Sequence, residues 1–248
     1  MDLLDRGEGP ALLLLHGFPL DRRIWEAQGE PLAERFRVLA PDLPGFGRSA
    51  GLPLPGSLEE AAGSLLGLLD SLGVDRFAAA GHSMGGYLVF ALYRAAPARI
   101  TGMGLVATRA AADSPEARRA REETALRALR EGPGFLAESM PARQTSEGAP
   151  PDLLDRLRPI MRGATGEGVA AWSRAMAARP DATPDLERIS VPTVVVAGRR
   201  DKIVPAAESE AMGRAIPGAR MVWCERSGHL PMMEEPDRVT EALRGLGA

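Results

Sequence analysis

The chain has 248 residues, 45% of them hydrophobic, which is long enough for one large α/β domain with an insertion. Its formal net charge is -3, and no block of lysine and arginine has the pattern of a nucleic-acid-binding surface, so we expect no nucleic acid as a partner. The single cysteine, Cys224, excludes an intrachain disulfide and a cysteine-based metal cluster, and we expect it to be a small buried apolar side chain.

The N-terminal residues predict no export signal. They are acidic at Asp2 and Asp5, whereas a signal peptide begins with positive charge, and the apolar run 11–15 is too short for its hydrophobic segment. No run approaches the roughly 20 apolar residues of a membrane span. We therefore expect a cytoplasmic protein that has no membrane as a partner.

Short apolar runs alternate with longer amphipathic ones along the chain. Continuous apolar runs of this length are typical of strands that are buried on both faces of a sheet. The predicted strands are 11–15, 37–40, 77–80, 102–107, 193–197 and 219–224. The predicted helices are 57–72, with Ser57 as its N-cap, 84–96, 206–216 and 236–246. This alternation predicts an α/β fold with a mostly parallel, doubly wound sheet.

The alternation stops between Arg109 and Ile189. This segment has no strand-like run and is rich in alanine, arginine and glutamate, with prolines that end or kink helices at positions 133, 141, 150, 151, 180 and 184. We expect an inserted helical cap at 109–189, and a core formed by 1–108 and 190–248.

The segment Gly81-His82-Ser83-Met84-Gly85 places a serine between a predicted strand and a predicted helix. A turn of this GxSxG type holds the serine in a strained backbone conformation and exposes its hydroxyl group. The five-residue pattern is weak alone, because glycine-rich turns are common. Other residues are needed to separate a nucleophile from an ordinary turn.

A serine nucleophile needs a base within hydrogen-bond reach and a third group that orients the base. The chain has three histidines. His82 precedes the serine on the strained turn and is predicted to point away from its hydroxyl, and His16 ends the first predicted strand. We expect both to brace their turns by hydrogen bonds, which leaves His229 as the base for Ser83.

Asp201 and His229 follow the last two predicted strands. Both therefore leave the sheet at the edge where Ser83 emerges. The order serine, aspartate, histidine is the one found in hydrolases with this kind of nucleophile turn. The alternative for Asp201 is a surface turn, which glycine and aspartate favour.

The oxyanion of a tetrahedral intermediate needs hydrogen-bond donors. The backbone N–H of Met84, next to the serine, is one candidate. The second is the N–H of Phe18 in His16-Gly17-Phe18-Pro19, because Gly17 permits a tight turn directly after the first predicted strand.

Together these residues resemble the α/β-hydrolase-fold serine hydrolases. The matching segments are His16 to Pro19, Pro41-Asp42-Leu43-Pro44-Gly45-Phe46-Gly47-Arg48-Ser49, Gly81 to Gly86, Gly198 to Asp201, and Gly228-His229. Within this family the chain is most similar to 3-oxoadipate enol-lactonases and related small carboxylesterases. The family's other position for the acid follows the predicted strand 102–107, where this chain has Thr108, which cannot serve.

Two features bear on the sheet and the substrate pocket. Members of the family usually begin with an antiparallel hairpin, whereas only ten residues precede Ala11, so we expect at least one N-terminal edge strand to be missing. We expect Trp172, Met176 and Leu230 to line an apolar substrate pocket. The alternative is that such side chains pack in the interior of the cap and core.

The predicted function is hydrolysis of a small carboxylic ester or lactone through an acyl-enzyme intermediate, without a metal or organic cofactor, by a monomer or homodimer. Three alternatives stay open: a carbon-carbon bond hydrolase of ring-cleavage products, a cofactor-free perhydrolase, and a slow-turnover receptor for small molecules. Haloalkane dehalogenases and epoxide hydrolases of this family need an aspartate at position 83, so Ser83 argues against both.

Overall fold

A seven-stranded sheet runs through residues 1–246, the part of the chain that this computed structural model describes. The strands lie in the order β1-β3-β2-β4-β5-β6-β7, and every neighbouring pair is parallel except β1 with β3. Their bounds are β1 Leu3–Arg6, β2 Ala11–Leu15, β3 Arg37–Pro41, β4 Phe77–His82, β5 Ile100–Val106, β6 Thr193–Gly198 and β7 Arg220–Cys224. The mostly parallel α/β fold and its six predicted strands are confirmed.

The strand β1 was not predicted. It has four residues, the last two of which are exposed, so it lacks the continuous apolar run of the inner strands. It pairs antiparallel with β3, with Leu3 opposite Pro41 and Arg6 opposite Val38. Residues 1–10 thus hold one edge strand in place of the hairpin that the resemblance implies.

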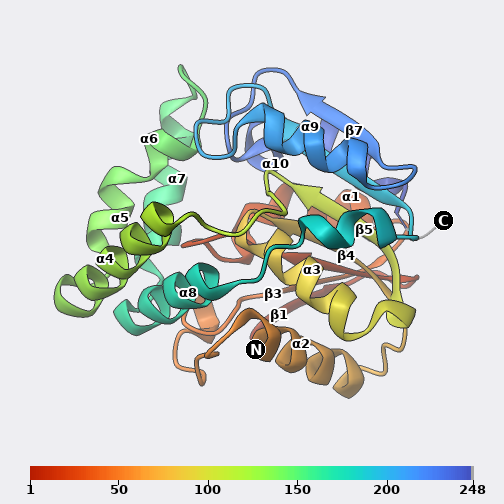
Figure 1. The fold of residues 1–248 in the computed structure, drawn as a ribbon, viewed down its shortest axis with the longest axis horizontal. Coiled ribbons are helices and arrows are strands. Elements are labelled where there is room, and N and C mark those ends of the chain that lie inside the picture. The colour runs from red at the N-terminus through yellow and green to blue at the C-terminus, as the bar shows by residue number, and fades with distance from the viewer. Residues whose placement is uncertain (247–248) are drawn as a thin grey trace.

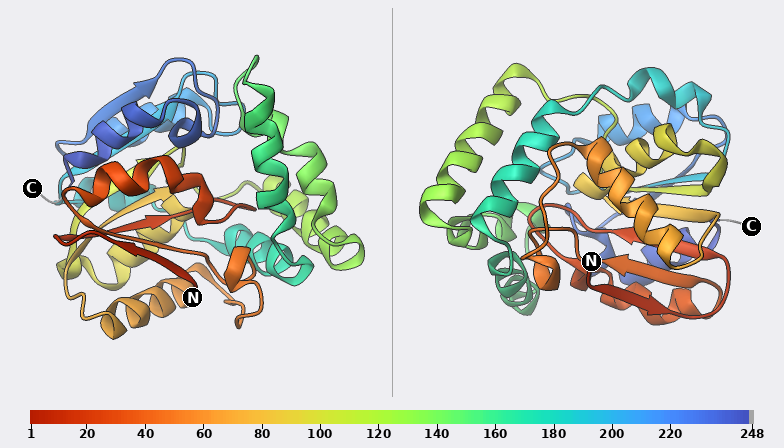
Figure 2. Two further views of the ribbon diagram at one scale, coloured as in Figure 1. Left: turned by 180° about the vertical axis from the view of Figure 1, so that it is seen from behind. Right: turned by 90° about the horizontal axis from the view of Figure 1, so that it is seen from below.

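Helices cover both faces of the sheet (Figures 1 and 2). Successive side chains of a strand point to opposite faces, and in β2 Leu13 and Leu15 join one buried cluster while Leu12 and Leu14 join the other. The first face is covered by α2 (Leu58–Ser71), α3 (Met84–Ala95) and α9 (Ala206–Ala215), and the second by α1 (Glu26–Ala33), α10 (Pro231–Glu234) and α11 (Pro236–Arg244). None of the helices in residues 1–246 is long and apolar enough to cross a membrane.

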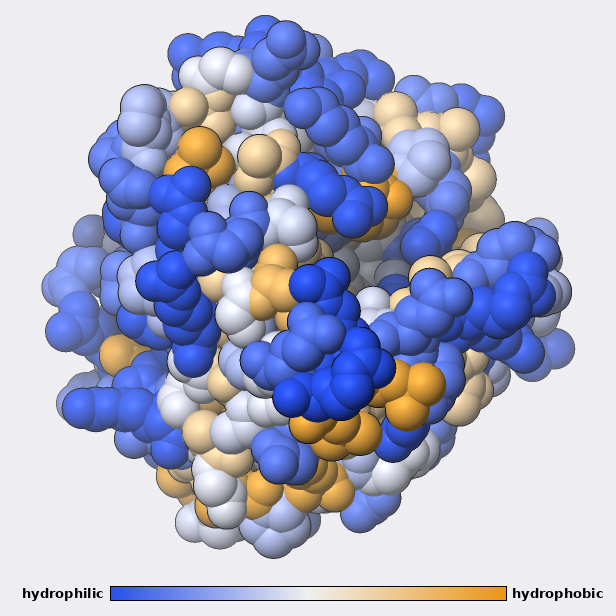
Figure 3. Space-filling model, turned by 90° about the vertical axis from the view of Figure 1, so that its left-hand side faces the viewer, coloured by the Kyte–Doolittle hydropathy of each residue, from blue (hydrophilic) through white to orange (hydrophobic). Residues whose placement is uncertain are grey.

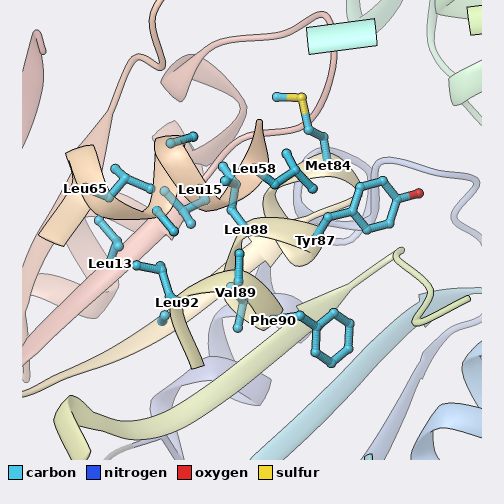
Figure 4. Packing of buried hydrophobic residues seen from close by; sticks show 14 of the residues in the cluster. Leu13, Leu15, Leu58, Leu65, Met84, Tyr87, Leu88, Val89, Phe90 and Leu92 are labelled. Atoms are coloured by element: carbon cyan, nitrogen blue, oxygen red, sulfur yellow. The ribbon is translucent and has the colours of Figure 1, made fainter. Parts of the chain in front are cut away.

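The helix α3 is the most deeply buried of these helices. Its side chains Leu88 and Leu92 pack between β2 and α2 (Figure 4). The neighbouring helix α2 begins as predicted, because the Ser57 hydroxyl accepts a hydrogen bond from the Glu60 N–H at 3.1 Å. Because α3 is held by this packing, the turn at Ser83 that precedes it has a fixed position.

Five α-helices and a short 3-10 helix (Thr183–Arg188) occupy the chain between β5 and β6, and we call the five α-helices the cap helices. They are α4 (Pro115–Glu131), α5 (Gly134–Ser139), α6 (Pro141–Gln144), α7 (Pro151–Arg162) and α8 (Gly166–Ala178). They lie together at one end of the sheet, with α4 packed along α8 (Figure 1). The Trp172 side chain of α8 is fully buried, and its indole N–H donates to the Pro44 carbonyl at 2.7 Å, which ties α8 to the loop after β3.

A buried ion cluster ties both ends of the cap helices to the core. The Asp113 carboxylate lies 2.6 Å from Arg121 and 2.8 Å from Arg179. The Arg179 guanidinium also donates to the Ala111 carbonyl at 2.7 Å and lies 4.0 Å from the ring centroid of Tyr87 on α3. Burial by itself raises the pKa of Asp113, but the two arginines bring it below its ordinary value. The carboxylate is therefore ionised and holds the chain where it leaves and rejoins the core.

We predict that Asp113→Ala destabilises the protein by about 3–5 kcal/mol, because it leaves the buried Arg179 without its counter-ion. Urea unfolding followed by circular dichroism measures this loss. The control is Glu131→Ala, which removes an exposed ion pair with Arg127 and should leave the free energy of unfolding nearly unchanged. Equal stabilities of the two variants would contradict the anchoring role of Asp113.

Candidate active site

Ser83 occupies a strained turn between β4 and α3. Its backbone angles are φ 50° and ψ -110°, in a region that residues other than glycine rarely adopt. From Phe77 to Leu92 every residue is buried except Ser83, which is partly exposed. The fold thus presents one hydroxyl group from an otherwise buried strand and helix.

Two glycines let the chain pass through this turn. A Cβ atom at Gly81 would overlap the Gly85 carbonyl, and a Cβ atom at Gly85 would overlap the Leu15 carbonyl at the end of β2. Larger residues would push β2, β4 and α3 apart. The glycines that flank Ser83 in the sequence are therefore required by close backbone packing.

Thr108, which follows β5, supports the turn from behind. Its hydroxyl donates to the Ser83 carbonyl at 2.8 Å, and the Ser83 N–H donates to the Val106 carbonyl at 2.9 Å. A Cβ atom at Gly86 would overlap the Thr108 side chain. The residue that occupies the family's other acid position thus holds the backbone of Ser83.

His229 and Asp201 lie together at the same edge of the sheet. His229 Nδ1 is 2.7 Å from Asp201 Oδ2, and both side chains are 2% exposed. Asp201 Oδ1 accepts the backbone N–H groups of Ile203 at 2.7 Å and Val204 at 3.0 Å. The carboxylate is fixed by these bonds and orients the imidazole, which keeps Nε2 available for another partner.

His82 joins the Ser83 turn to the loop of His229. The two imidazole rings are 4.8 Å apart between centroids, and His82 Nε2 lies 2.8 Å from the His229 carbonyl. Because a carbonyl only accepts, His82 Nε2 carries the proton. Burial, and the neighbouring His229, hold the pKa of His82 well below its ordinary value. His82 is therefore a neutral brace.

His16 braces the loop after β2 as the opposite tautomer. Its Nδ1 donates to the Gly17 carbonyl at 3.0 Å, and its Nε2 accepts the Leu43 N–H at 2.9 Å. Burial lowers the pKa of His16 as well. Its ring is neutral and fixes the peptide that precedes Phe18.

The two candidate oxyanion donors follow the neighbouring parallel strands β2 and β4. Phe18 follows β2, and Met84 is the first residue of α3. Within residues 1–246 neither backbone N–H donates a hydrogen bond to another protein group. Both remain available to a ligand.

A cleft of about 460 Å³ opens between the cap helices and the core. Its lining comprises Phe18, Arg109, Arg121, Thr124, Arg127, Phe135, Leu136, Ser139, Met140, Arg143, Ser173, Lys202 and Ile203. The cap end of the molecule shows such a hollow, surrounded largely by hydrophilic side chains (Figure 3). The cleft borders the candidate site through Phe18, which carries one proposed donor, and Lys202, which follows Asp201.

The three side chains expected to line a substrate pocket, Trp172, Met176 and Leu230, are all buried. Trp172 packs against Phe46, with ring centroids 6.1 Å apart, and Met176 is buried in the same cluster. Leu230 lies in the cluster on the other face of the sheet. None of the three lines the cleft, whose lining is partly apolar and partly polar, so their role in substrate binding stays a prediction.

A larger cleft of about 560 Å³ lies elsewhere, beside the loops after β2 and β3. Its three carboxylates are paired with arginines: Asp21 with Arg23 at 2.6 Å, Asp42 with Arg22 at 2.8 Å and Glu26 with Arg156 at 3.7 Å. None of the candidate catalytic residues lines it. In the described part of the chain no group of three or more His, Cys, Asp and Glu side chains is placed to hold a metal ion.

Comparison with known proteins shows the family to which the chain belongs. A model described as "Alpha/beta hydrolase family" matches residues 12–242. The chain belongs to this family.

Two similar members have solved structures. A thermophilic esterase from Thermogutta terrifontis, solved with malate bound, is 45% identical with a TM-score of 0.94, over 98% of this chain and 91% of that one. The enol-lactonase from Burkholderia xenovorans LB400 is 30% identical with a TM-score of 0.89, over 98% and 94%. The resemblance predicted from the motifs is confirmed at the level of this hydrolase family.

One curated relative is longer than this chain. The dihydrolipoyllysine-residue acetyltransferase component of the acetoin cleaving system from Pseudomonas putida is 29% identical in an alignment that covers 95% of this chain. The match spans 62% of the relative's own length.

One residue at the candidate site, Gln144, was not predicted from the sequence. Gln144, at the end of α6, accepts the His229 N–H on its backbone carbonyl at 2.7 Å, and its side-chain amide donates to the Phe18 carbonyl at 3.2 Å. The side chain is buried, and no described group bonds its Oε1. Gln144 lies in a polar stretch without periodicity, so no sequence signal distinguished it. It couples a cap helix to both loops of the site.

The two neutral histidines predict acid lability. The unfolded chain binds protons on His16 and His82 below about pH 6.5, whereas the folded protein keeps both neutral, so stability falls as the pH drops below that value. Each proton contributes about 1.4 kcal/mol per pH unit.

Urea unfolding at pH 7, 6 and 5 measures this slope, and His82→Gln, which keeps a donor for the His229 carbonyl, should reduce it by about one proton. An unchanged slope in the variant would show that His82 is protonated in the folded protein.

Proposed function

We propose that this alpha/beta hydrolase is a serine hydrolase that cleaves a small carboxylic ester or lactone through an acyl-enzyme intermediate. The proposal rests on Ser83, which has a strained backbone and is partly exposed. The turn that holds Ser83 also contains His82, whose ring lies 4.8 Å from the ring of His229. The 2.7 Å contact between His229 and Asp201 supplies the orientation that a general base needs. The similar esterase and enol-lactonase support this substrate class.

In the proposed reaction Ser83 Oγ attacks the carbonyl carbon while His229 Nε2 takes its proton. Asp201 stabilises the resulting imidazolium. The Phe18 and Met84 N–H groups hold the oxyanion, and their lack of protein acceptors supports that role. His229 then gives the proton to the leaving alcohol oxygen as the C–O bond breaks.

The second half of the reaction repeats these steps with water. His229 takes a proton from water, the hydroxide attacks the acyl carbon, and the proton passes to Ser83 Oγ as the acyl bond breaks. The carboxylic acid then leaves. We also propose that residues 1–108 and 190–248, of which 247–248 lie outside the described residues, form the core that holds these groups. Residues 109–189 would form the cap that covers the substrate.

Ser83→Ala should lower kcat for 4-nitrophenyl butyrate by about 10⁴-fold or more, because no other group forms the acyl-enzyme. Asp201→Asn should lower it by about 10³ to 10⁴-fold, since the imidazole loses its orienting acceptor. Initial rates measured at 405 nm test both variants, with circular dichroism to confirm folding.

Ser64→Ala is the matched control, because Ser64 is an exposed serine on α2 outside the site, and its kcat should not change. Full activity of the folded Ser83→Ala variant would overturn the proposed nucleophile.

Gln144→Ala should lower kcat by roughly fivefold with little change in KM, because the Phe18 loop loses a hydrogen bond of about 1 kcal/mol that aligns the oxyanion donor. The control is Gln28→Ala, which removes a buried glutamine bonded to the Met232 and Pro236 carbonyls. It should lose stability at unchanged kcat. If both variants lose stability and keep kcat, Gln144 has only a structural role.

A further inference from the structure

A loop of the core lies directly against a segment of the cap beside the proposed base. We call residues 226–229, which end at His229, the base loop, and residues 144–146, which begin at the last residue of α6, the cap segment. The His229 N–H donates to the Gln144 carbonyl at 2.7 Å. A Cβ atom at Gly228 would lie 2.6 Å from the Ser146 nitrogen, so the two backbones pack without room for a side chain.

One carboxylate forms hydrogen bonds with both of these segments. Glu234 is the last residue of α10, the short helix that follows His229. Its Oε1 accepts the Gly228 N–H at 2.9 Å, and its Oε2 accepts the Ser146 N–H at 2.9 Å. Hydrogen bonds to a carboxylate are stronger than those between neutral groups. Glu234 thus joins the base loop to the cap segment through a single side chain.

The neighbouring glutamate holds the same loop but does not reach the cap. Glu235 Oε1 accepts the Arg226 N–H at 2.9 Å and the Ser227 hydroxyl at 2.8 Å. Among residues 1–246 no group of the cap bonds to this carboxylate. Within this pair of adjacent carboxylates, Glu234 is therefore the one that connects the base loop to the cap.

These contacts fix the backbone that carries the imidazole of His229. The His229 carbonyl accepts from His82 Nε2 at 2.8 Å, and its N–H donates to the cap segment. The N–H of the preceding residue donates to Glu234. The direction of His229 Nε2 depends on this backbone as well as on Asp201, because the side chain starts at its Cα atom. Since proton transfer requires close alignment of the base, a small shift of the loop lowers the rate.

We propose that Glu234 is a positioning residue of the reaction: its carboxylate holds the base loop against the cap, so that His229 has its reactive position only while the cap segment lies on the loop. This inference rests on the proposed hydrolase function and adds a residue that acts through the base loop. Glu234 does not line the cleft between the cap helices and the core, so its role lies in the chemical step and not in substrate binding.

Glu234→Gln keeps the length of the side chain but replaces one acceptor oxygen by an NH2 group, so either the Gly228 or the Ser146 N–H loses its acceptor. The variant should lower kcat for 4-nitrophenyl butyrate about tenfold, the effect of one hydrogen bond to a charged group, and change KM by less than about twofold. Initial rates measure both constants, with circular dichroism to confirm folding.

Glu235→Gln is the matched control, because it removes an acceptor from the same loop and leaves the link to the cap intact. It should lower the free energy of unfolding while its kcat does not change. An unchanged kcat in the folded Glu234→Gln variant, or equal losses of kcat in the two variants, would overturn the positioning role. A higher KM at unchanged kcat in Glu234→Gln would overturn it as well.

A second variant breaks the contact from the side of the cap. Ser146→Pro deletes the N–H that donates to Glu234, and the extended backbone of Thr145, at φ -95° and ψ 161°, is one that a residue before proline adopts. It should lower kcat about as much as Glu234→Gln. The double variant should lose about tenfold in all and not about 100-fold, because both changes break one contact. Additive losses would show that Glu234 acts without the cap and would overturn the proposal.

Amide hydrogen exchange separates a failure of this inference from a failure of the proposed hydrolysis. The Gly228 and His229 N–H groups should exchange slowly in the unsubstituted protein and faster in Glu234→Gln, whereas Glu235→Gln should leave both slow. If the protein cleaves no ester, the proposed function fails, and the exchange rates still test the link between the base loop and the cap. Unchanged exchange of both groups in Glu234→Gln would overturn that link.

Discussion

The close contact of β2, β4 and α3 around Ser83 is the constraint on which the rest of the structure depends. It requires glycine at positions 81 and 85, because a Cβ atom at either would overlap backbone. The same contact forces the positive φ of Ser83, a conformation that costs free energy and persists only where the surroundings hold it. Here Thr108 and the buried α3 hold it.

Hydrogen bonds made by two neutral imidazole rings connect the loops at the sheet edge that carries Ser83. His16 fixes the peptide before Phe18, and His82 fixes the carbonyl of His229, so each loop of the site is bonded to a buried imidazole. Charged imidazoles could not accept the Leu43 N–H in this way, and burial keeps both rings neutral. His16 and His82 take no part in the proposed reaction, but their hydrogen bonds determine where the reacting groups lie.

Two sets of contacts hold the cap helices, one to the core and one to the loops of the candidate site. The Asp113–Arg179 cluster fixes the ends of the cap segment, and Gln144 of α6 reaches the loops of Phe18 and His229 directly. Gln144 thus connects one cap helix to both loops of the candidate site.

The sequence by itself determined the parallel sheet and the candidates for the chemistry. The five inner strands were predictable because a strand buried on both faces must be apolar throughout, and the edge strand β7 still has a mostly apolar sequence. Ser83, Asp201 and His229 were identifiable because each follows one of these six strands. The edge strand β1 was not predictable, because its exposed half carries no apolar signal. Only the tertiary structure decided the role of Gln144, the burial of Trp172 and the lining of the cleft, because each depends on contacts between segments far apart in the chain.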